Sequence, residues 1–241
     1  MKVSNKILWV AIGGLFGCVV AFLIFIRVST APLMEKIGQQ PNMSGSKELV
    51  DRSYPLKYFS GIKASGKWNL ELKQGDVYAI NIRVPEYMLE GVIVDKQKDT
   101  LVLGIKKGWR IKDHTLYAAI TFPSLQHILV SGSTDVRVNG FNCEHLKVRA
   151  SGSTRIKSDG IQVYYLTVEG SGSIDVDFQG SPVTFAELDL SGSSKIQMTM
   201  AGGDLTGKIS GSGRVIYDGE VRHQEVKIRG SGSIQRKRST V

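Results

Sequence analysis

The tripeptide Ser-Gly-Ser recurs through the second half of this 241-residue chain at a nearly constant spacing. Its six copies begin at Ser131, Ser151, Ser171, Ser191, Ser210 and Ser231, which lie 20, 20, 20, 19 and 21 residues apart. Self-similarity at a fixed period is the signature of a supersecondary unit whose copies stack on one another. The second half of the chain is therefore predicted to be an array of short repeats.

Two segments within each repeat alternate between apolar and polar residues. One apolar column lies five residues after the opening serine, at Val136, Ile156, Val176, Ile196 and Val215. A second, mostly apolar column lies three residues before it, at Ile128, Val148, Val168, Leu188, Gly207 and Ile228. Because alternation with a period of two puts successive side chains on opposite faces, both segments are predicted to be strands with one face turned inward.

The glycine of each Ser-Gly-Ser tripeptide marks the corner between these two strands. Glycine readily adopts backbone angles that other residues avoid, and serine can hydrogen-bond to nearby backbone groups. The predicted corner glycines are Gly132, Gly152, Gly172, Gly192, Gly211 and Gly232. A second corner is predicted at Asn139-Gly140, Asp159-Gly160, Gln179-Gly180 and Asp218-Gly219.

Charged residues at outward positions favour parallel stacking of the repeats. Four residues after the opening serine stand Asp135, Arg155, Asp175, Lys195 and Arg214. If layers lie ~4.8 Å apart, the first three of these are neighbours of alternating sign, and opposite charges on adjacent strands are mildly stabilising. The predicted fold class is all-β, a parallel β-helix or solenoid of ~20-residue repeats. An antiparallel meander with Ser-Gly-Ser at alternate hairpin ends is the alternative.

Residues 7–26 form an unbroken apolar run of 20 residues between Lys6 and Arg27. A helix of this length can cross the hydrocarbon core of a bilayer, so a single transmembrane helix is predicted before the β-structure. Lys2 and Lys6 favour a cytoplasmic N-terminus, which would place the β-structure in the periplasm or outside the cell. Lipidation of Cys18, within a segment similar to a bacterial lipobox, is one alternative, and cleavage as a signal peptide is another.

The remaining sequence suggests the following domain plan. Residues 1–6 are the cytoplasmic N-terminus, 27–55 a polar linker, 56–130 an irregular β-region or cap, 131–234 the repeats, and 235–241 a basic tail. Residues 56–130 contain alternating segments without the strict period, and the terminal units of repeat proteins are usually atypical.

The net charge of +9 is unevenly distributed along the chain. Residues 131–230 hold 11 basic and 12 acidic side chains, a net charge of −1. Residues 1–56, 57–130 and 231–241 contribute +3, +4 and +3. Nucleic acid binding requires a basic stripe along the binding surface. The predicted repeats lack one, so no nucleic acid partner is expected.

Phe59-Ser60-Gly61-Ile62, a Gln74-Gly75 turn and the 20-residue Ser-Gly-Ser register resemble a bacterial family, the putative auto-transporter adhesins with a head GIN domain. The resemblance covers roughly residues 57–234. Gly61-Ile62-Lys63 corresponds to the Gly-Ile-Asn for which the family is named, with lysine in place of asparagine. The resemblance implies an all-β, β-helix-like protein of the cell envelope with no established biochemical activity.

No catalytic, metal-binding or cofactor-binding pattern emerges from the sequence. Calcium-binding β-rolls need aspartates about every nine residues, whereas Asp135 and Asp175 alternate here with Arg155 and Lys195. The four histidines, His114, His127, His145 and His223, lack metal-ligand spacing, and Cys143-x-His145 lacks two further ligands. We therefore expect a protein without catalytic residues, metal or cofactor, which is not an enzyme.

One segment is a candidate binding site, comprising Lys106, Lys107, Trp109, Arg110 and Lys112. Cations beside an aromatic ring can bind anionic glycans or phosphates. One alternative is an edge strand protected by lysines, and another is a solvated loop with the tryptophan packed inward. The sequence thus predicts a membrane-anchored, non-catalytic module that binds an envelope glycan or protein or serves a structural role. A polysaccharide-active enzyme and an envelope-stress sensing accessory protein are the alternatives.

Overall fold

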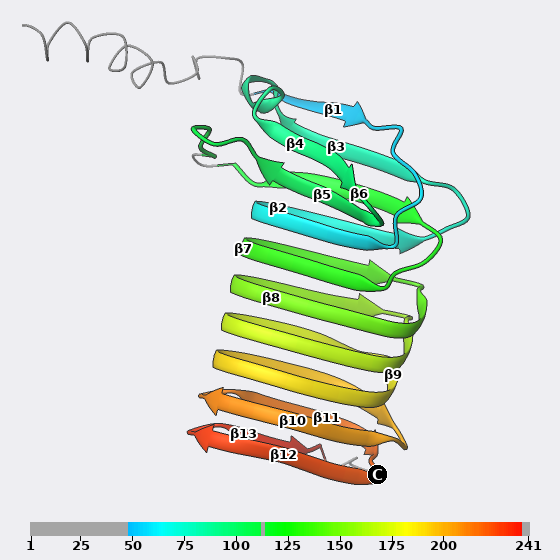
Figure 1. The fold of residues 1–241 in the computed structure, drawn as a ribbon, viewed down its shortest axis with the longest axis vertical. Coiled ribbons are helices and arrows are strands. Elements are labelled where there is room, and N and C mark those ends of the chain that lie inside the picture. The colour runs from blue at the N-terminus through cyan, green and yellow to red at the C-terminus, as the bar shows by residue number, and fades with distance from the viewer. Residues whose placement is uncertain (1–47, 112–113, 238–241) are drawn as a thin grey trace, which may run out of the picture. The chain divides into compact units, whose positions relative to one another are not determined.

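A computed structural model of the chain describes residues 48–111 and 114–237, which fold almost entirely as β-strands (Figure 1). The strands are β1 (Leu49–Ser53), β2 (Gly61–Gln74), β3 (Ala79–Pro85), β4 (Val92–Gln97), β5 (Thr100–Ile105), β6 (Leu116–Phe122), β7 (His127–Asn139), β8 (Asn142–Asp159), β9 (Gln162–Ala201), β10 (Asp204–Gly211), β11 (Arg214–Glu220), β12 (His223–Gly230) and β13 (Ser233–Arg236). A short 3-10 turn, η1 (Glu86–Met88), separates β3 from β4. All of these strands belong to one sheet.

The repeats lie on one another in parallel, in the register set by Ser-Gly-Ser. Ser131 pairs with Ser151, Ser151 with Ser171, and Ser191 with Ser210. The predicted parallel register is therefore confirmed for these repeats, and the antiparallel meander is excluded for them. Each repeat bends at its corner, so it contributes two arms to the sheet, and we call each such bent repeat a layer (Figure 1).

Both ends of this register differ from the sequence prediction. In the last layer Gly230, not Gly232, pairs with Gly211. Gly230 also has the positive φ of a corner, 108°. At the other end, Gly66 of β2 pairs with Gly132, so β2 forms one further layer. This layer is hidden in the sequence because β3 to β6 are inserted between β2 and β7.

The strands inserted after β2 give the sheet a mixed edge. β1 and β3 pair antiparallel, as do β3 and β6, and β4 pairs antiparallel with β5. β6 and β5 in turn lie parallel to different parts of β2. The sheet order runs β1-β3-β6-β2-β7-β8-β9-β10-β12, so the antiparallel strands continue the parallel layers without a break.

The predicted fold class, a parallel β-helix or solenoid preceded by one transmembrane helix, is therefore wrong. The structure is one continuous 13-stranded sheet of mixed direction. None of the described residues forms a helix long and apolar enough to cross a bilayer. Residues 7–26 and Cys18 lie outside the described residues. Three further predictions depended on that helix: the single-pass topology, the membrane as a partner and the localisation in the cell membrane. These predictions are wrong for the same reason.

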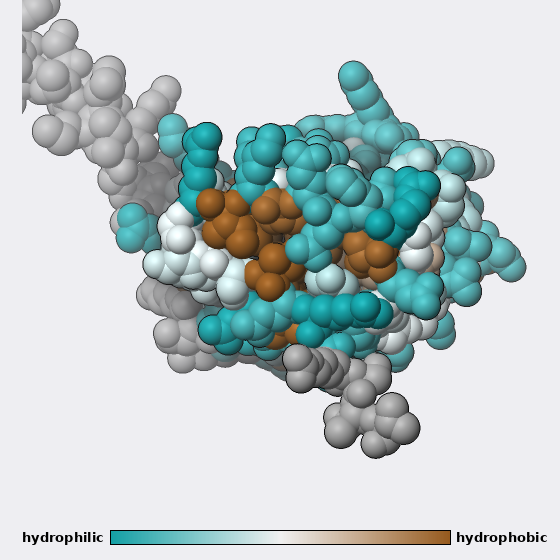
Figure 2. Space-filling model, turned by 90° about the horizontal axis from the view of Figure 1, so that it is seen from below, coloured by the Kyte–Doolittle hydropathy of each residue, from teal (hydrophilic) through white to brown (hydrophobic). Residues whose placement is uncertain are grey.

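The core is built from the inward residues of successive layers. Ile128, Val148, Val168 and Leu188 are all fully buried, as the alternation predicts. The end formed by β12 and β13 differs, because Ile228 is 39% exposed and Val226 and Ile234 are only partly buried. Figure 2 shows this end with apolar residues at its centre and hydrophilic residues around them.

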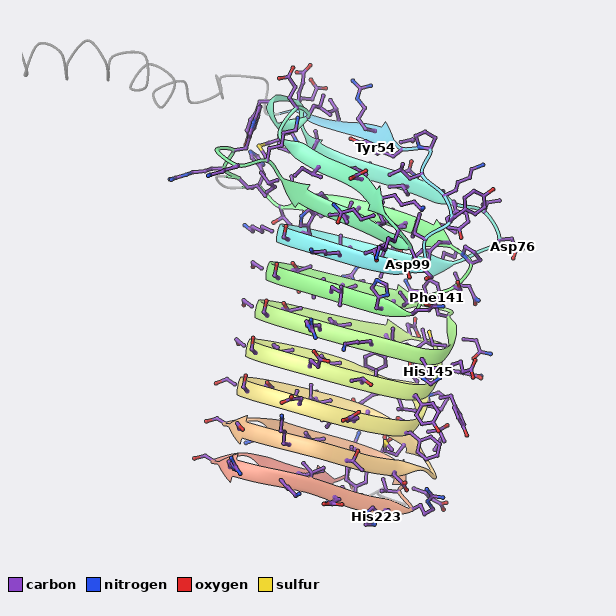
Figure 3. The ribbon with its side chains drawn as sticks, viewed as in Figure 1. Tyr54, Asp76, Asp99, Phe141, His145 and His223 are labelled. Atoms are coloured by element: carbon purple, nitrogen blue, oxygen red, sulfur yellow. The ribbon has the colours of Figure 1, made fainter. Side chains whose placement is uncertain are left out.

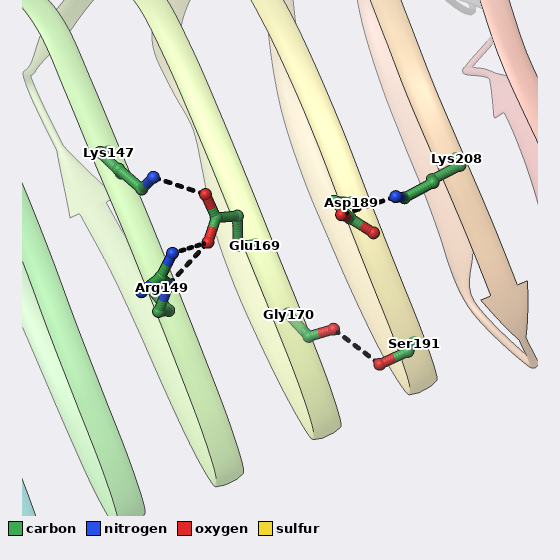
Figure 4. A network of polar contacts seen from close by, with 7 residues as sticks. All are labelled: Lys147, Arg149, Glu169, Gly170, Asp189, Ser191 and Lys208. Atoms are coloured by element: carbon green, nitrogen blue, oxygen red, sulfur yellow. Dashed lines mark hydrogen bonds and ion pairs between the residues drawn. The ribbon is translucent and has the colours of Figure 1, made fainter.

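Outward charges form ladders between layers (Figure 4). Glu169 contacts both Lys147 and Arg149 of the preceding layer, each at 2.5 Å. Arg155 lies between Asp135 at 3.3 Å and Asp175 at 3.8 Å. The alternating charges predicted at Asp135, Arg155 and Asp175 are thereby confirmed as ion pairs. Asp189 lies one layer beyond Glu169 and carries the same negative charge. It pairs instead with Lys208 of the next layer at 3.0 Å.

The corner glycines form a column in which backbone lies directly against backbone. Gly132, Gly152, Gly172, Gly192, Gly211 and Gly230 all have positive φ. A Cβ atom at any of them would lie 2.5–2.8 Å from the carbonyl oxygen of the glycine in the preceding layer. Side chains rarely tolerate either condition, so this corner requires glycine in every layer.

We predict that Gly152→Ala lowers the free energy of unfolding by about 3 kcal/mol, combining left-handed strain with displacement of the Gly132 carbonyl. Gly160→Ala is the matched control, since φ there is +60° but no atom lies within 4 Å of the added Cβ. We expect that variant to lose only about 1 kcal/mol. Urea unfolding of both variants measures the difference, and equal losses would contradict a role for backbone contact.

A second prediction concerns the Glu169 ladder. Its hydrogen bonds with Lys147 and then Arg149 lower the pKa of the Glu169 carboxyl below the ordinary value of 4.5. Because the carboxyl binds a proton less readily in the folded protein than in the unfolded chain, its ionised form stabilises the fold at pH values above 4.5. This stabilisation is lost as the pH falls through the lowered pKa and the carboxyl becomes protonated. We expect Glu169→Gln to cost about 1 kcal/mol at pH 7, and the difference from wild type to narrow as the pH falls below 4.5.

Glu187→Gln is the control for that measurement. Glu187 also points outward, though it is more exposed than the half-buried Glu169, and it forms no ion pair within residues 48–111 and 114–237. We expect its stability to follow that of the wild type at every pH. A loss in Glu169→Gln that persists unchanged at low pH would show that the ion pairs are not its cause.

Candidate functional site

An outward column of aromatic rings lies beside the second corner of successive layers. The rings of His145 and Tyr165 are stacked with centroids 4.9 Å apart and planes 5° from parallel. Tyr165 stacks in turn on Phe185 at 4.8 Å and 18°. Tyr164 meets Tyr165 and Phe185 edge-on, at 4.8 and 5.4 Å. We call these four residues the ring column.

The local chain path explains why these rings face outward. Between Cys143 and Leu146, both buried, two successive residues point away from the core, and the same interruption of alternation recurs one layer later. His145, labelled in Figure 3, is directly paired in the sheet with Tyr165, so the two rings lie one above the other. The sequence carries this signal as aromatic residues at 145, 165 and 185, but the predicted strand columns did not include that position.

Arg222 packs against Phe185, the ring of the column that lies nearest the C-terminal layers. The Arg222 guanidinium carbon lies 5.9 Å from the centre of the Phe185 ring, which is a cation–π geometry. Arg222 also forms a two-pronged ion pair with Asp204, at 2.9 and 2.7 Å. Hydrogen bonding from Arg222 lowers the pKa of the Asp204 carboxyl below its usual range. The charge of Arg222 is thus already balanced where it meets the rings.

A groove of about 740 Å³ borders the ring column at His145, the ring that lies nearest the N-terminal layers. It is lined by Ser124, Leu125, Gln126, His127, Leu129, Asn142, Cys143, Glu144, His145, Lys147 and Arg149. His127 pairs with Lys147, which places Leu125 in the layer above His145. Leu125 is buried, so its side chain does not continue the column of rings.

The predicted cationic binding segment is a turn whose tryptophan packs against the protein instead of lying beside the cations in solvent. Lys106–Trp109 forms a turn after β5, closed by a hydrogen bond from the Trp109 N–H to the Lys106 carbonyl at 3.1 Å. The half-buried Trp109 ring packs over Gly91, where an added Cβ would lie 2.4 Å from the ring. Lys106, Lys107 and Arg110 are exposed, and Lys112 lies outside the described residues. The turn therefore presents cations to solvent while the tryptophan is used in packing.

Comparison with known proteins identifies the family. Residues 58–186 and 166–241 match the family described as "Putative auto-transporter adhesin, head GIN domain". The chain belongs to this family. Comparison with curated proteins gives no match.

Solved structures of two proteins resemble the fold of this chain. A putative adhesin from Bacteroides fragilis is 21% identical, with a TM-score of 0.65, over 80% of this chain and 98% of that one. A putative adhesin from Parabacteroides merdae is 20% identical, with a TM-score of 0.50, over the same shares. At these identities the likeness shows the fold alone.

The segment that corresponds to the family's Gly-Ile-Asn opens β2 and is part of the packing. Ile62 is fully buried. Gly61 lies under the His127 ring, and a Cβ there would be 1.8 Å from the ring nitrogen Nε2. That nitrogen also lies 2.8 Å from the Thr100 hydroxyl oxygen. In this head GIN protein the segment therefore holds β2 against β5 and β7.

Cys143 and His145, the pair considered for metal binding, lie on opposite faces of β8. Cys143 is buried in the core, whereas His145 is exposed. Burial raises the pKa of the Cys143 thiol to about 12, so the thiol stays protonated at neutral pH. The two side chains cannot converge on one ion, and the thiol is not available as a nucleophile.

We predict that Cys143 in the native protein does not react with Ellman's reagent at pH 8. Because only the thiolate reacts and burial also blocks access, labelling should require unfolding. Wild type and Cys143→Ser should therefore release equal amounts of thionitrobenzoate when native, and differ by one equivalent in guanidinium chloride. A difference in the native state would contradict the buried position.

Proposed function

We propose that this chain is a non-catalytic binding module that holds its ligand against the outer surface of the sheet. The exposed ring column carries this proposal. Tyr164 and Tyr165 are 49% and 41% exposed, although aromatic side chains gain free energy by leaving water. Clustered exposed aromatic rings with polar groups beside them are typical of recognition surfaces.

The frame beneath the rings supports the same function. The layers that carry the rings pair along both arms with the layers on either side, β7 at one end and β10 and β11 at the other. A surface that keeps its shape loses little conformational entropy when a ligand binds. A rigid, repetitive face of this kind suits an adhesion-type protein, which is how the family is described.

The electrostatics favour binding over catalysis. Asp51, Glu169 and Asp204 all have their pKa lowered by cations that bond to them. A general acid in a polysaccharide-active enzyme needs a carboxyl whose pKa is raised toward the working pH. These carboxylates instead belong to ion pairs within the sheet. The polysaccharide-active enzyme is therefore the less favoured reading.

A glycan array combined with a turnover assay tests the proposal. Full-length protein should bind at least one immobilised glycan saturably, and incubation with the same glycan in solution should release no new reducing ends. Turnover that a single carboxylate substitution abolishes would overturn the proposal in favour of the enzyme. Absence of saturable binding would also overturn it for glycan ligands.

A further inference from the structure

We propose that the groove above His145 is a subsite for one pyranose ring of a neutral glycan, which stacks on the open face of the imidazole. This inference rests on the proposed binding function and adds the place and the class of ligand. His145, its neighbours in the groove and the rings beneath it carry the argument.

The spacing of the ring column defines the first part of the subsite. Each ring lies 4.8–4.9 Å from the next, one layer of the sheet apart. His145 rests on Tyr165 with one face, and the groove borders it on the side of the layer above. Since Leu125 of that layer is buried, no ring of the sheet occupies the next place in the stack. A flat ring from a ligand can take that place.

The groove also offers hydrogen-bonding groups around the imidazole. Asn142 and Glu144 precede His145 on β8, and Gln126 comes from the layer above. Amides and carboxylates both suit sugar hydroxyls, because an amide donates and accepts hydrogen bonds while a carboxylate accepts them. A pyranose presents apolar C–H faces together with hydroxyls at its rim. The combination of one ring face with polar groups at its edge therefore fits a sugar.

The balance of charge favours a neutral sugar over an anionic one. Lys147 and Arg149 line the groove, but both bond to Glu169 of the next layer. His127 faces the Thr100 hydroxyl and covers Gly61. Glu144 adds a carboxylate that would repel an anion. The charged groups of the groove thus do not provide a free cation for phosphate or carboxylate.

The rings beneath His145 hold it ready for this contact. Its plane lies 5° from that of Tyr165, which in turn stacks on Phe185 and meets Tyr164 edge to face. A side chain held in the bound orientation loses less entropy on binding, so preorganisation strengthens a single stacking contact. The rings beneath His145 thus support the subsite by orienting the imidazole, while the sugar itself contacts His145 and the groove.

Isothermal titration calorimetry of the full-length protein tests the inference. The probes are the linear hexamers of glucose, N-acetylglucosamine, mannose and galactose. We expect at least one hexamer to bind, and His145→Ala to raise its dissociation constant about tenfold, the equivalent of about 1.4 kcal/mol. His145→Trp, which offers a larger ring face, should restore or tighten binding.

His223→Ala is the matched control. His223 pairs with Asp204 in the last layer, is exposed like His145, and does not line the groove (Figure 3). We expect this variant to bind as the wild type does, and all three variants to keep the wild-type unfolding temperature. Binding that is unchanged between about 50 and 500 mM salt would support a neutral ligand, because salt screens ionic contacts.

The inference fails if none of the four hexamers binds, or if His145→Ala binds as tightly as the wild type. It also fails if affinity falls steeply with salt. These outcomes are distinct from failure of the proposed function, which the broader glycan array decides. Array binding that His145→Ala leaves intact would retain the binding module and place its site elsewhere.

Discussion

The glycine column at the corner is the contact on which the rest of this structure depends. At each corner the backbone of one layer lies so close to the next that a Cβ would meet a carbonyl oxygen at 2.5–2.8 Å. This contact fixes both the distance and the register between layers. Each residue of a layer then lies over the residue that occupies the same place in the layer before, from Ser131 over Ser65 to Arg229 over Ser210. A layer displaced by one residue would exchange its inward and outward faces and expose its apolar side chains.

A fixed register turns single residues into columns, and each column then acquires its own chemistry. Inward positions make a continuous apolar core from Ile128 to Leu188. Outward charges alternate in sign along part of a column, so that Arg155 forms ion pairs with an aspartate in each of the two adjacent layers. Outward rings stack because the layers repeat at the distance that aromatic pairs favour. The same constraint therefore produces stability in two kinds of column and, in the third, the exposed rings that we propose as a recognition surface.

The sequence predicted those features that recur in it at one period. Ser-Gly-Ser predicted the parallel register from Ser131 to Ser210, and the outward charges predicted the ion pairs of Arg155 with Asp135 and Asp175. It could not reveal the layer of Gly66, which is separated from Gly132 by inserted strands, or the shift that brings Gly230 to the last corner. In that layer a Ser-Gly-Ser tripeptide is present, but pairing follows the backbone contact at Gly230. The transmembrane prediction came from an apolar run outside the described residues, and the described helical element is only three residues long.

The ring column was missed because the side chains beside the second corner do not follow the alternation of the rest of the strand. A period-two pattern describes a strand only while its residues alternate, and the positions around Glu144 and His145 break that rule beside a corner. There two successive side chains point outward, so a layer can place both a ring and a polar group on the surface. A regular strand places its outward residues about 6.8 Å apart along the chain, with a buried residue between them. Local departure from alternation thus gives the sheet a site where a ring face and hydrogen-bonding groups lie together, while the glycine corners keep the core below it unchanged.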